Sequence, residues 1–211
     1  SKEGLGTITY ADGAIYSGWL VDDKRAGKGS LTTPDGLVLS GEWNNGEFNG
    51  KGTITQPNGD VYYGNIANGV QEGAGEATYS NGDVYKGQFS NGFRQGYGEL
   101  IGVDSYHFVG DWFEGEIEGL GTETYPDGSV YKGEFISNLS DGNGEITYAS
   151  GATYKGKWKA GAVDGKGIST YPNGMVYDGN FKNGKIHGFG LMIFSDSYRY
   201  EGFWENGERH G

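Results

Sequence analysis

The residues able to do chemistry are few in this chain of 211 residues, which holds three histidines and no cysteine. The absence of cysteine excludes disulfides, thiol catalysis and cysteine-ligated zinc. His187 and His210 occupy one position of a repeat described below, which sets them two strands apart and too far for a shared zinc ion, and His107 has a different phase. We therefore predict no metal site.

Two further patterns could suggest catalysis, and neither holds. The segment from Gly161 to Gly167 is similar to a phosphate-binding loop, but it has too few spacer residues and a glycine where Ser or Thr must bind magnesium. Glu114, Glu116 and Glu118 alternate along the chain, which is typical of a solvated acidic surface rather than a catalytic carboxylate pair. The sequence thus predicts a protein that is not an enzyme, with no catalytic residue and no cofactor.

Composition indicates how such a chain can fold. Its 43 glycines would be typical of a disordered linker, but 16 Tyr, 10 Phe and 5 Trp are far too many for one. The mean hydropathy is -0.61 and no long apolar run exists, so a membrane-spanning helix is excluded. We expect a chain that folds through its aromatic residues.

A repeat of 23 residues organises the whole chain. A first series of single glycines recurs every 23 residues. A second series has the same step and consists of Gly-x-Gly pairs, from Gly4 and Gly6 to Gly188 and Gly190. The sequence predicts one continuous array over residues 1–211 of about nine units, and because both ends stop inside a unit we expect it to be excised from a longer array. The first series comprises Gly18, Gly41, Gly64, Gly87, Gly110, Gly133, Gly156, Gly179 and Gly202.

Large apolar residues flank each glycine of the first series at two residues on either side. This alternation predicts a β-strand with its rings on one face, and the shorter alternating segment before it, ending at a turn signal, completes a hairpin. We predict that this aromatic face binds a partner. The predicted binding residues are Tyr62, Tyr85, Phe89, Phe108, Trp112, Tyr131, Phe135, Tyr154, Trp158, Tyr177, Phe181, Tyr200 and Trp204.

The turn residues predict which side chains share that face. In Tyr171-Pro172-Asn173-Gly174, proline and glycine suit a type I turn followed by a left-handed residue, a three-residue loop. An odd loop keeps Gly167, Tyr177 and Gly179 on one face, where the glycines make room for rings. Because a lone hairpin is marginal in water, the units must pair side by side. We predict an all-β, elongated, single-layer antiparallel meander with a right-handed twist and no helix.

Charge is distributed unevenly. The net charge of -12 argues against nucleic acid as a partner and makes membrane lipid a less favoured one. The stretch from Glu99 to Glu145 holds 11 acids and one base, which predicts an acidic surface that attracts a basic partner. We expect this surface to include Glu99, Asp111, Glu114, Glu116, Glu118 and Glu123, and a basic patch on the face opposite the rings to comprise Lys155, Lys157 and Lys159.

The unit Tyr-x-Gly-x-Trp/Phe-x-x-Gly-x-x-x-Gly-x-Gly, complete from Tyr154 to Gly167, resembles the MORN repeat, and the resemblance covers essentially the whole chain. It implies an elongated sheet with an aromatic-lined groove, used for scaffolding, dimerisation or peptide docking, often near membranes or cytoskeleton. Leu39 and Ile66 depart from the aromatic pattern, as does Leu20.

Two functions follow as expectations. The first is a non-enzymatic protein-binding or scaffold module that docks a peptide or helix in the aromatic groove, or self-associates as a homodimer. The alternative is a membrane-proximal module that binds or tethers phospholipid through its basic patch. We expect a cytoplasmic location, at the cytoskeleton or close to a membrane.

Overall fold

The computed structural model describes residues 2–210, which form 19 β-strands and no helix. Residues 2–103 with 113–115 form one compact unit, and residues 104–112 with 116–210 form a second. Among the described residues there is no helix that could cross a membrane. The strands are β1 (Glu3–Thr9), β2 (Ile15–Val21), β3 (Lys24–Thr32), β4 (Val38–Asn44), β5 (Glu47–Thr55), β6 (Val61–Ala67), β7 (Val70–Thr78), β8 (Val84–Ser90), β9 (Phe93–Ile101), β10 (His107–Phe113), β11 (Glu116–Thr124), β12 (Val130–Ile136), β13 (Leu139–Thr147), β14 (Thr153–Lys159), β15 (Ala162–Thr170), β16 (Val176–Lys182), β17 (Lys185–Ile193), β18 (Arg199–Glu205) and β19 (Glu208–His210).

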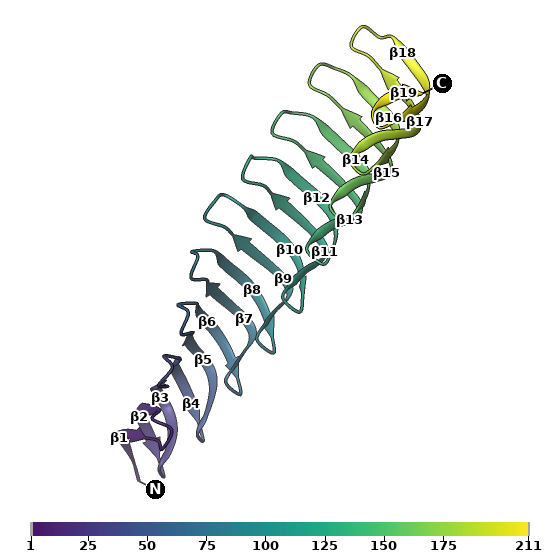
Figure 1. Ribbon diagram of the computed structural model, residues 1–211. Helices are drawn as coiled ribbons and strands as arrows, with labels where there is room; N and C mark the ends of the chain where they lie inside the picture. The colour runs from purple at the N-terminus through teal and green to yellow at the C-terminus, as the bar shows by residue number, and fades with distance from the viewer. Residues whose placement is uncertain (1, 211) are drawn as a thin grey trace. The chain divides into compact units, whose positions relative to one another are not determined.

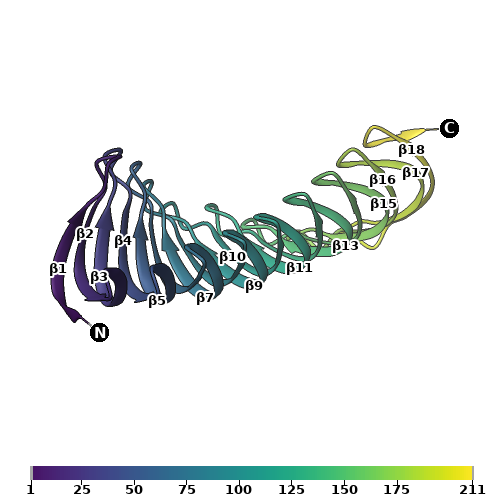
Figure 2. The same cartoon turned by 90° about the horizontal axis from the view of Figure 1, so that it is seen from below.

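Each strand pairs antiparallel with the next one along the chain, from β1 to β9 in the first unit and from β11 to β19 in the second. Within each unit the hairpins lie side by side (Figure 1), and their strands are bent rather than flat (Figure 2). The predicted all-β antiparallel meander without helices is confirmed. The sequence predicted one hairpin in each of nine units, and the short β19 is an additional strand that this prediction did not include.

The predicted three-residue loops are confirmed. The Gly174 N–H donates to the Tyr171 carbonyl at 2.9 Å, and the Tyr171 N–H donates to the Met175 carbonyl at 2.9 Å. Gly174 has a φ of 85°, the left-handed conformation that this loop requires. Because the loop is odd, Gly167 pairs with Gly179 and both lie on the face of the Tyr177 ring.

The connections at the other end of the strands are two-residue turns, which the sequence analysis had not assigned. In Asn45-Gly46 both residues have positive φ, 51° and 88°, as a type I′ turn requires. The Gly46 N–H also donates to the Arg25 carbonyl at 2.9 Å, so the turn is held by the preceding repeat. Each repeat therefore carries one odd loop and one even turn.

The core of each unit consists of stacked rings over glycine. The Tyr131 ring is fully buried, and a Cβ added at Gly144 on the neighbouring strand would overlap with its hydroxyl and ring carbons. Phe135 and Trp158 pack edge-on to Tyr131, with ring centroids 5.1 and 4.9 Å away. The prediction that the glycines make room for rings is confirmed, and the same overlap explains why glycine is used in these strand interiors.

A bulge explains why the buried ring is a tyrosine. Between Gly133 and Phe135, a step of two residues on β12 faces a step of four on β13, so the ladder is interrupted there. The Tyr131 hydroxyl donates to the Glu134 carbonyl in this gap at 3.0 Å. A buried hydroxyl needs such an acceptor, and the bulge supplies it. The same bond to the carbonyl three residues on is made by Tyr16, Tyr62, Tyr85, Tyr154, Tyr177 and Tyr200.

Candidate functional site: a hollow beside Tyr79 and Arg94

The thirteen aromatic residues predicted to bind a partner form the core of the two units. All but the partly buried Tyr200 are at most 7% exposed. The rings pack edge-to-face against one another and also lie against glycine backbone. A partner on this side of the sheet would therefore meet the loops and the side chains around these rings more than the rings themselves.

Several of the predicted surface acids bind backbone amides. Asp111 accepts a hydrogen bond from the Leu120 N–H at 3.0 Å, and Glu118 accepts one from the Ser137 N–H at 2.9 Å. Both carboxylates satisfy N–H groups that a bulge or a turn leaves without a strand partner. Glu99 pairs in register with Lys86 on the opposite face. Only part of the acidic stretch is therefore left for a partner.

Glu114 and Glu116 lie at a turn and are exposed, as expected, but Glu123 is not a surface residue. Its side chain lies on the ring-bearing face and is 9% exposed. The reason is its register: Glu123 pairs with Tyr131, so both side chains share one face. The alternating pattern of the strand could have predicted this, because Glu123 stands where neighbouring repeats have apolar residues.

The predicted basic residues Lys155, Lys157 and Lys159 are exposed on the face opposite Tyr154 and Trp158. Lys155 is not isolated, because its Nζ lies 3.5 Å from a carboxylate oxygen of Glu145 on the neighbouring strand. Hydrogen bonds from Asn143 hold the pKa of Glu134 below its ordinary value, and the positive charge of Lys157 makes a smaller contribution. The patch thus alternates lysine with carboxylate.

The histidines do not come together. Within residues 2–210 no group of three or more His, Cys, Asp or Glu side chains could hold a metal ion. The His187 Nδ1 is buried without a hydrogen-bond partner among those residues. Its repeat position is the one at which Asp164 accepts a bond from the Asn183 N–H at 3.1 Å, so the position serves to hold a turn.

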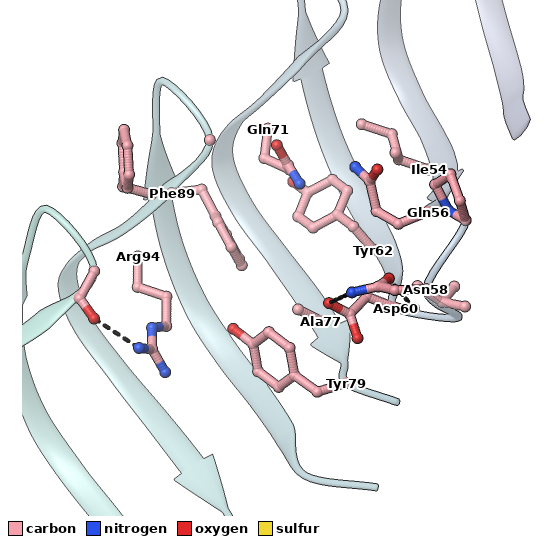
Figure 3. A pocket seen from close by; sticks show the side chains of 15 residues that line it. Ile54, Gln56, Asn58, Asp60, Tyr62, Gln71, Ala77, Tyr79, Phe89 and Arg94 are labelled. Carbon is pink, nitrogen blue, oxygen red and sulfur yellow. Dashed lines mark hydrogen bonds between the residues drawn. The ribbon is translucent and has the colours of Figure 1, made fainter. Parts of the chain in front are cut away.

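A hollow of about 580 Å³ opens on the ring-bearing side of the first unit. Figure 3 shows its floor, formed by Tyr62 and Phe89, whose ring centroids are 4.9 Å apart. Burial, with a smaller contribution from Glu72, raises the pKa of Tyr62 to about 12. At the rim, Phe93 is 55% exposed. The hollow therefore combines a buried aromatic floor with an exposed aromatic rim.

One wall of the hollow consists of Arg94 and Tyr79 (Figure 3). The Arg94 Nη2 donates to the Gly115 carbonyl at 2.6 Å, and its Cζ lies 5.9 Å from the centroid of the Tyr79 ring. Burial raises the pKa of Tyr79, and the positive charge of Arg94 opposes that shift. The guanidinium is thus fixed at both ends, by a carbonyl and by a ring.

The opposite wall is the loop before β6. Asn58 donates to the Asp60 carboxylate at 2.9 Å, and Asp60 also accepts the Ser80 N–H at 2.7 Å. The Ser80 bond is the main cause that lowers the pKa of Asp60. The side chains of Gln56 and Gln71 also line the hollow (Figure 3). Amides, a guanidinium and rings in this arrangement can hydrogen-bond a peptide backbone and cover an apolar side chain.

Sequence reasoning identified the floor of this hollow but missed Tyr79, Gln71 and Arg94. The sequence does contain a pattern that marks Tyr79 and Arg94. Arg94 follows Tyr79, an aromatic residue in a loop, by 15 positions, and Arg25 follows Tyr10 by the same number. No comparable pattern marks Gln71.

The comparison with solved structures found similar chains. The TCP10 domain of CPAP from Danio rerio matches with 11% identity and a TM-score of 0.52, and the match covers 98% of each chain. The TCP domain of SAS-4 (dCPAP) from Drosophila melanogaster, solved in complex with a proline-rich motif of Ana2 (dSTIL), matches with 15% identity and a TM-score of 0.45 over 88% of this chain and 97% of that one. At such identities the likeness concerns the fold. No curated protein is similar enough to count as a relative.

The family comparison rests on the repeat itself. The model of the MORN repeat matches ten consecutive segments, residues 2–15, 16–38, 40–61, 62–84, 85–105, 108–130, 131–153, 154–176, 177–197 and 200–211. These segments follow the 23-residue step of the glycines and rings described above. The chain therefore belongs to the MORN repeat family.

Proposed function

We propose that this chain is a non-enzymatic protein-binding module that docks an extended segment of a partner protein in the hollow beside Tyr79 and Arg94. The observation that carries the proposal is the lining of that hollow, in which an exposed ring at Phe93 stands over buried rings. An apolar side chain of the partner would cover Phe93 and contact Phe89.

Specificity would come from the polar walls. The amides of Gln56 and Gln71 offer donors and acceptors on two sides of the hollow (Figure 3), which suits the alternating N–H and C=O groups of an extended backbone. Arg94 is held in place by the Gly115 carbonyl, so it presents a fixed cation at the rim. Fixed side chains lose little conformational entropy on binding.

Peptide display tests this proposal without knowledge of the partner. Selection of a random peptide library on the whole chain should enrich peptides whose affinity falls at least about tenfold in Phe93→Ala and Gln71→Ala. The matched control is Phe203→Ala, because Phe203 is 59% exposed but lies in the second unit. The proposal would be overturned if the enriched peptides bind Phe93→Ala and Gln71→Ala as tightly as the unchanged chain, or if the selection enriches no peptide.

Lipid binding through Lys155, Lys157 and Lys159 is the less supported function. The ion pair of Lys155 with Glu145 reduces the positive potential that an anionic headgroup would meet. The localisation of the chain and its self-association stay predictions from the sequence.

A further inference from the structure

Three repeats contain an internal arginine site of one design. The Arg25 Cζ lies 5.6 Å from the centroid of the Tyr10 ring, and the Arg94 Cζ lies 5.9 Å from that of Tyr79. In the third, the Arg209 Cζ lies 4.9 Å from the Phe194 ring. Each arginine follows its aromatic residue by 15 positions. The recurrence shows that this corner of the repeat accommodates a guanidinium.

The carbonyl of the neighbouring two-residue turn completes the site. Nη2 of Arg25 donates to the Gly46 carbonyl at 2.7 Å, and Nη2 of Arg94 donates to the Gly115 carbonyl at 2.6 Å. A guanidinium has several donors in one plane, so it can bond a carbonyl at its edge while its face lies over a ring.

The corresponding corner at Tyr125 in the second unit has a different side chain. The residue 15 positions on is Ser140, which is 5% exposed. The corresponding turn carbonyl belongs to Gly161, whose N–H donates to the Ser140 carbonyl at 2.9 Å. A serine side chain is too short to reach that turn as an arginine does. The ring and the turn are kept, but the arginine is missing.

A buried carboxylate stands beside this corner. Glu123 accepts hydrogen bonds from the Tyr106 hydroxyl at 2.9 Å and from the Tyr125 hydroxyl at 2.6 Å. The corresponding residues beside Arg94 and Arg25 are Ala77 and Ile8, which are uncharged. No lysine or arginine forms an ion pair with Glu123 in the part of the chain that the structure describes. Two neutral donors stabilise this buried anion but do not neutralise it.

Neighbouring acids strengthen the negative potential. Burial is the main cause that raises the pKa of Tyr131, and the charges of Glu134, Glu123 and Asp141 raise it further. Their carboxylates are thus close enough to act on the same group of rings. A cation placed beside Tyr125 would be attracted by several of them.

We propose that Tyr125, Glu123 and the turn at Gly161 form a receptor for an arginine side chain of a partner protein. The partner's guanidinium lies over the Tyr125 ring, bonds the Gly161 carbonyl and neutralises Glu123, in the position that Arg94 takes in its own repeat. Arginine suits this site better than lysine, because only a guanidinium offers a flat face and several edge donors together. The site lies in the second unit, so it can fail or succeed independently of the hollow beside Arg94.

The direct test is a titration of the full chain with the tripeptide acetyl-Gly-Arg-Gly-amide, followed by NMR of the backbone amides. The citrulline peptide, which has the same shape without the charge, is the control ligand, and the lysine peptide tests the preference for a guanidinium. We expect saturable shifts around Ser140 and Gly161 with the arginine peptide, at least tenfold weaker binding in Glu123→Gln, and little binding of citrulline. Equal affinity for Glu123→Gln, or no saturable shift, would overturn the proposal.

A second test supplies the arginine from the chain itself. Ser140→Arg should raise the melting temperature and abolish binding of the tripeptide, because the new side chain fills the site. Val163→Arg is the matched control: position 163 follows Tyr148 by 15 positions, but Ile146 stands in the place of Glu123, as Ile8 does beside Arg25, so this variant should raise the melting temperature less than Ser140→Arg and leave tripeptide binding intact. If both variants behave alike, or if Ser140→Arg gains the same stability with Glu123→Gln, the corner is no arginine receptor. Should Ser140→Arg not fold, as circular dichroism would show, the titration of Glu123→Gln decides.

Discussion

The two faces of the same strands are built on different rules. On β14, Tyr154 and Trp158 point into the core and correspond to a large apolar residue in every repeat, whereas Lys155 and Lys157 on the opposite face correspond to residues of changing type. The ring-bearing face is fixed because each ring must fit the glycine of a neighbouring strand. The opposite face varies more because most of its side chains lie in solvent, apart from carboxylates such as Glu118 that bind turn amides. Most of the stability should therefore reside on the ring-bearing face.

Alkaline pH should cause the largest loss of stability, because it acts on the buried tyrosines of the ring-bearing face. Burial raises the pKa of Tyr62, Tyr85, Tyr154 and Tyr177 to about 12, against about 10 in an unfolded chain. The stability from keeping these hydroxyls neutral is complete below pH about 10 and is lost as the pH rises toward 12. We expect tyrosine ionisation, measured by ultraviolet absorbance, to coincide with loss of the β-sheet signal. If all tyrosines ionise while the sheet stays intact, the prediction that burial of these hydroxyls couples their ionisation to unfolding is wrong.

Removal of one ring should have the next largest effect. Trp158 is 7% exposed and packs edge-on against Tyr131 and Tyr154, so Trp158→Ala should cost about 3 to 5 kcal/mol in denaturant unfolding. Trp158→Phe is the control and should cost less, because the Trp158 Nε1 has no hydrogen-bond partner among the described residues. Trp43→Phe should cost more than Trp158→Phe, because the Trp43 Nε1 donates to the Gly29 carbonyl at 3.0 Å.

A single methyl group added on the ring-bearing face should also lower the stability. Gly144→Ala places a Cβ against the Tyr131 ring and should cost about 1 to 3 kcal/mol. Gly6→Ala is the control, since there the Cβ meets only the end of the Leu20 side chain, which can move. Melting temperatures of the two variants separate ring overlap from the general effect of replacing glycine in a strand. Equal losses would show that the overlap is relieved elsewhere.

The hydroxyl of the core tyrosine should contribute less than its ring. Tyr131→Phe removes the bond to the Glu134 carbonyl and should cost about 1 kcal/mol. Phe108 is the natural version of this change, because it is fully buried at the tyrosine position. Phe108→Tyr should therefore gain up to about 1 kcal/mol if the carbonyl of Asp111 accepts its hydroxyl. A loss of stability in Phe108→Tyr would show that this repeat lacks the acceptor.

The smallest effect is expected on the opposite face. Glu145→Gln removes the ion pair with Lys155, in which the side chains are 53% and 78% exposed, and should change stability by less than about 1 kcal/mol. The change should shrink further at high salt. A large, salt-independent loss would mean that the opposite face also supports the fold.

The sequence was sufficient to predict the hairpins, the odd loops and the shared face of rings and glycines, because each depends on local spacing. It did not predict the hollow, because Tyr79 lies in a loop and meets Arg94 from a later strand. Glu123 was assigned to the acidic surface by its charge, although its register places it beside Tyr131. Charge alone does not tell which face of a strand a residue occupies, whereas its parity with the neighbouring rings does.

The two kinds of connection have a consequence for how such chains change length. The odd loop preserves the parity of paired residues and the two-residue turn inverts it, so an odd number of residues, 23, returns every ring to its own face. A single inserted or deleted residue in a strand would send the following rings to the solvent side. Lengthening by duplication of one whole unit keeps every ring in place. Gain or loss of whole units is therefore the change of length that this array accommodates without moving a ring to the solvent side.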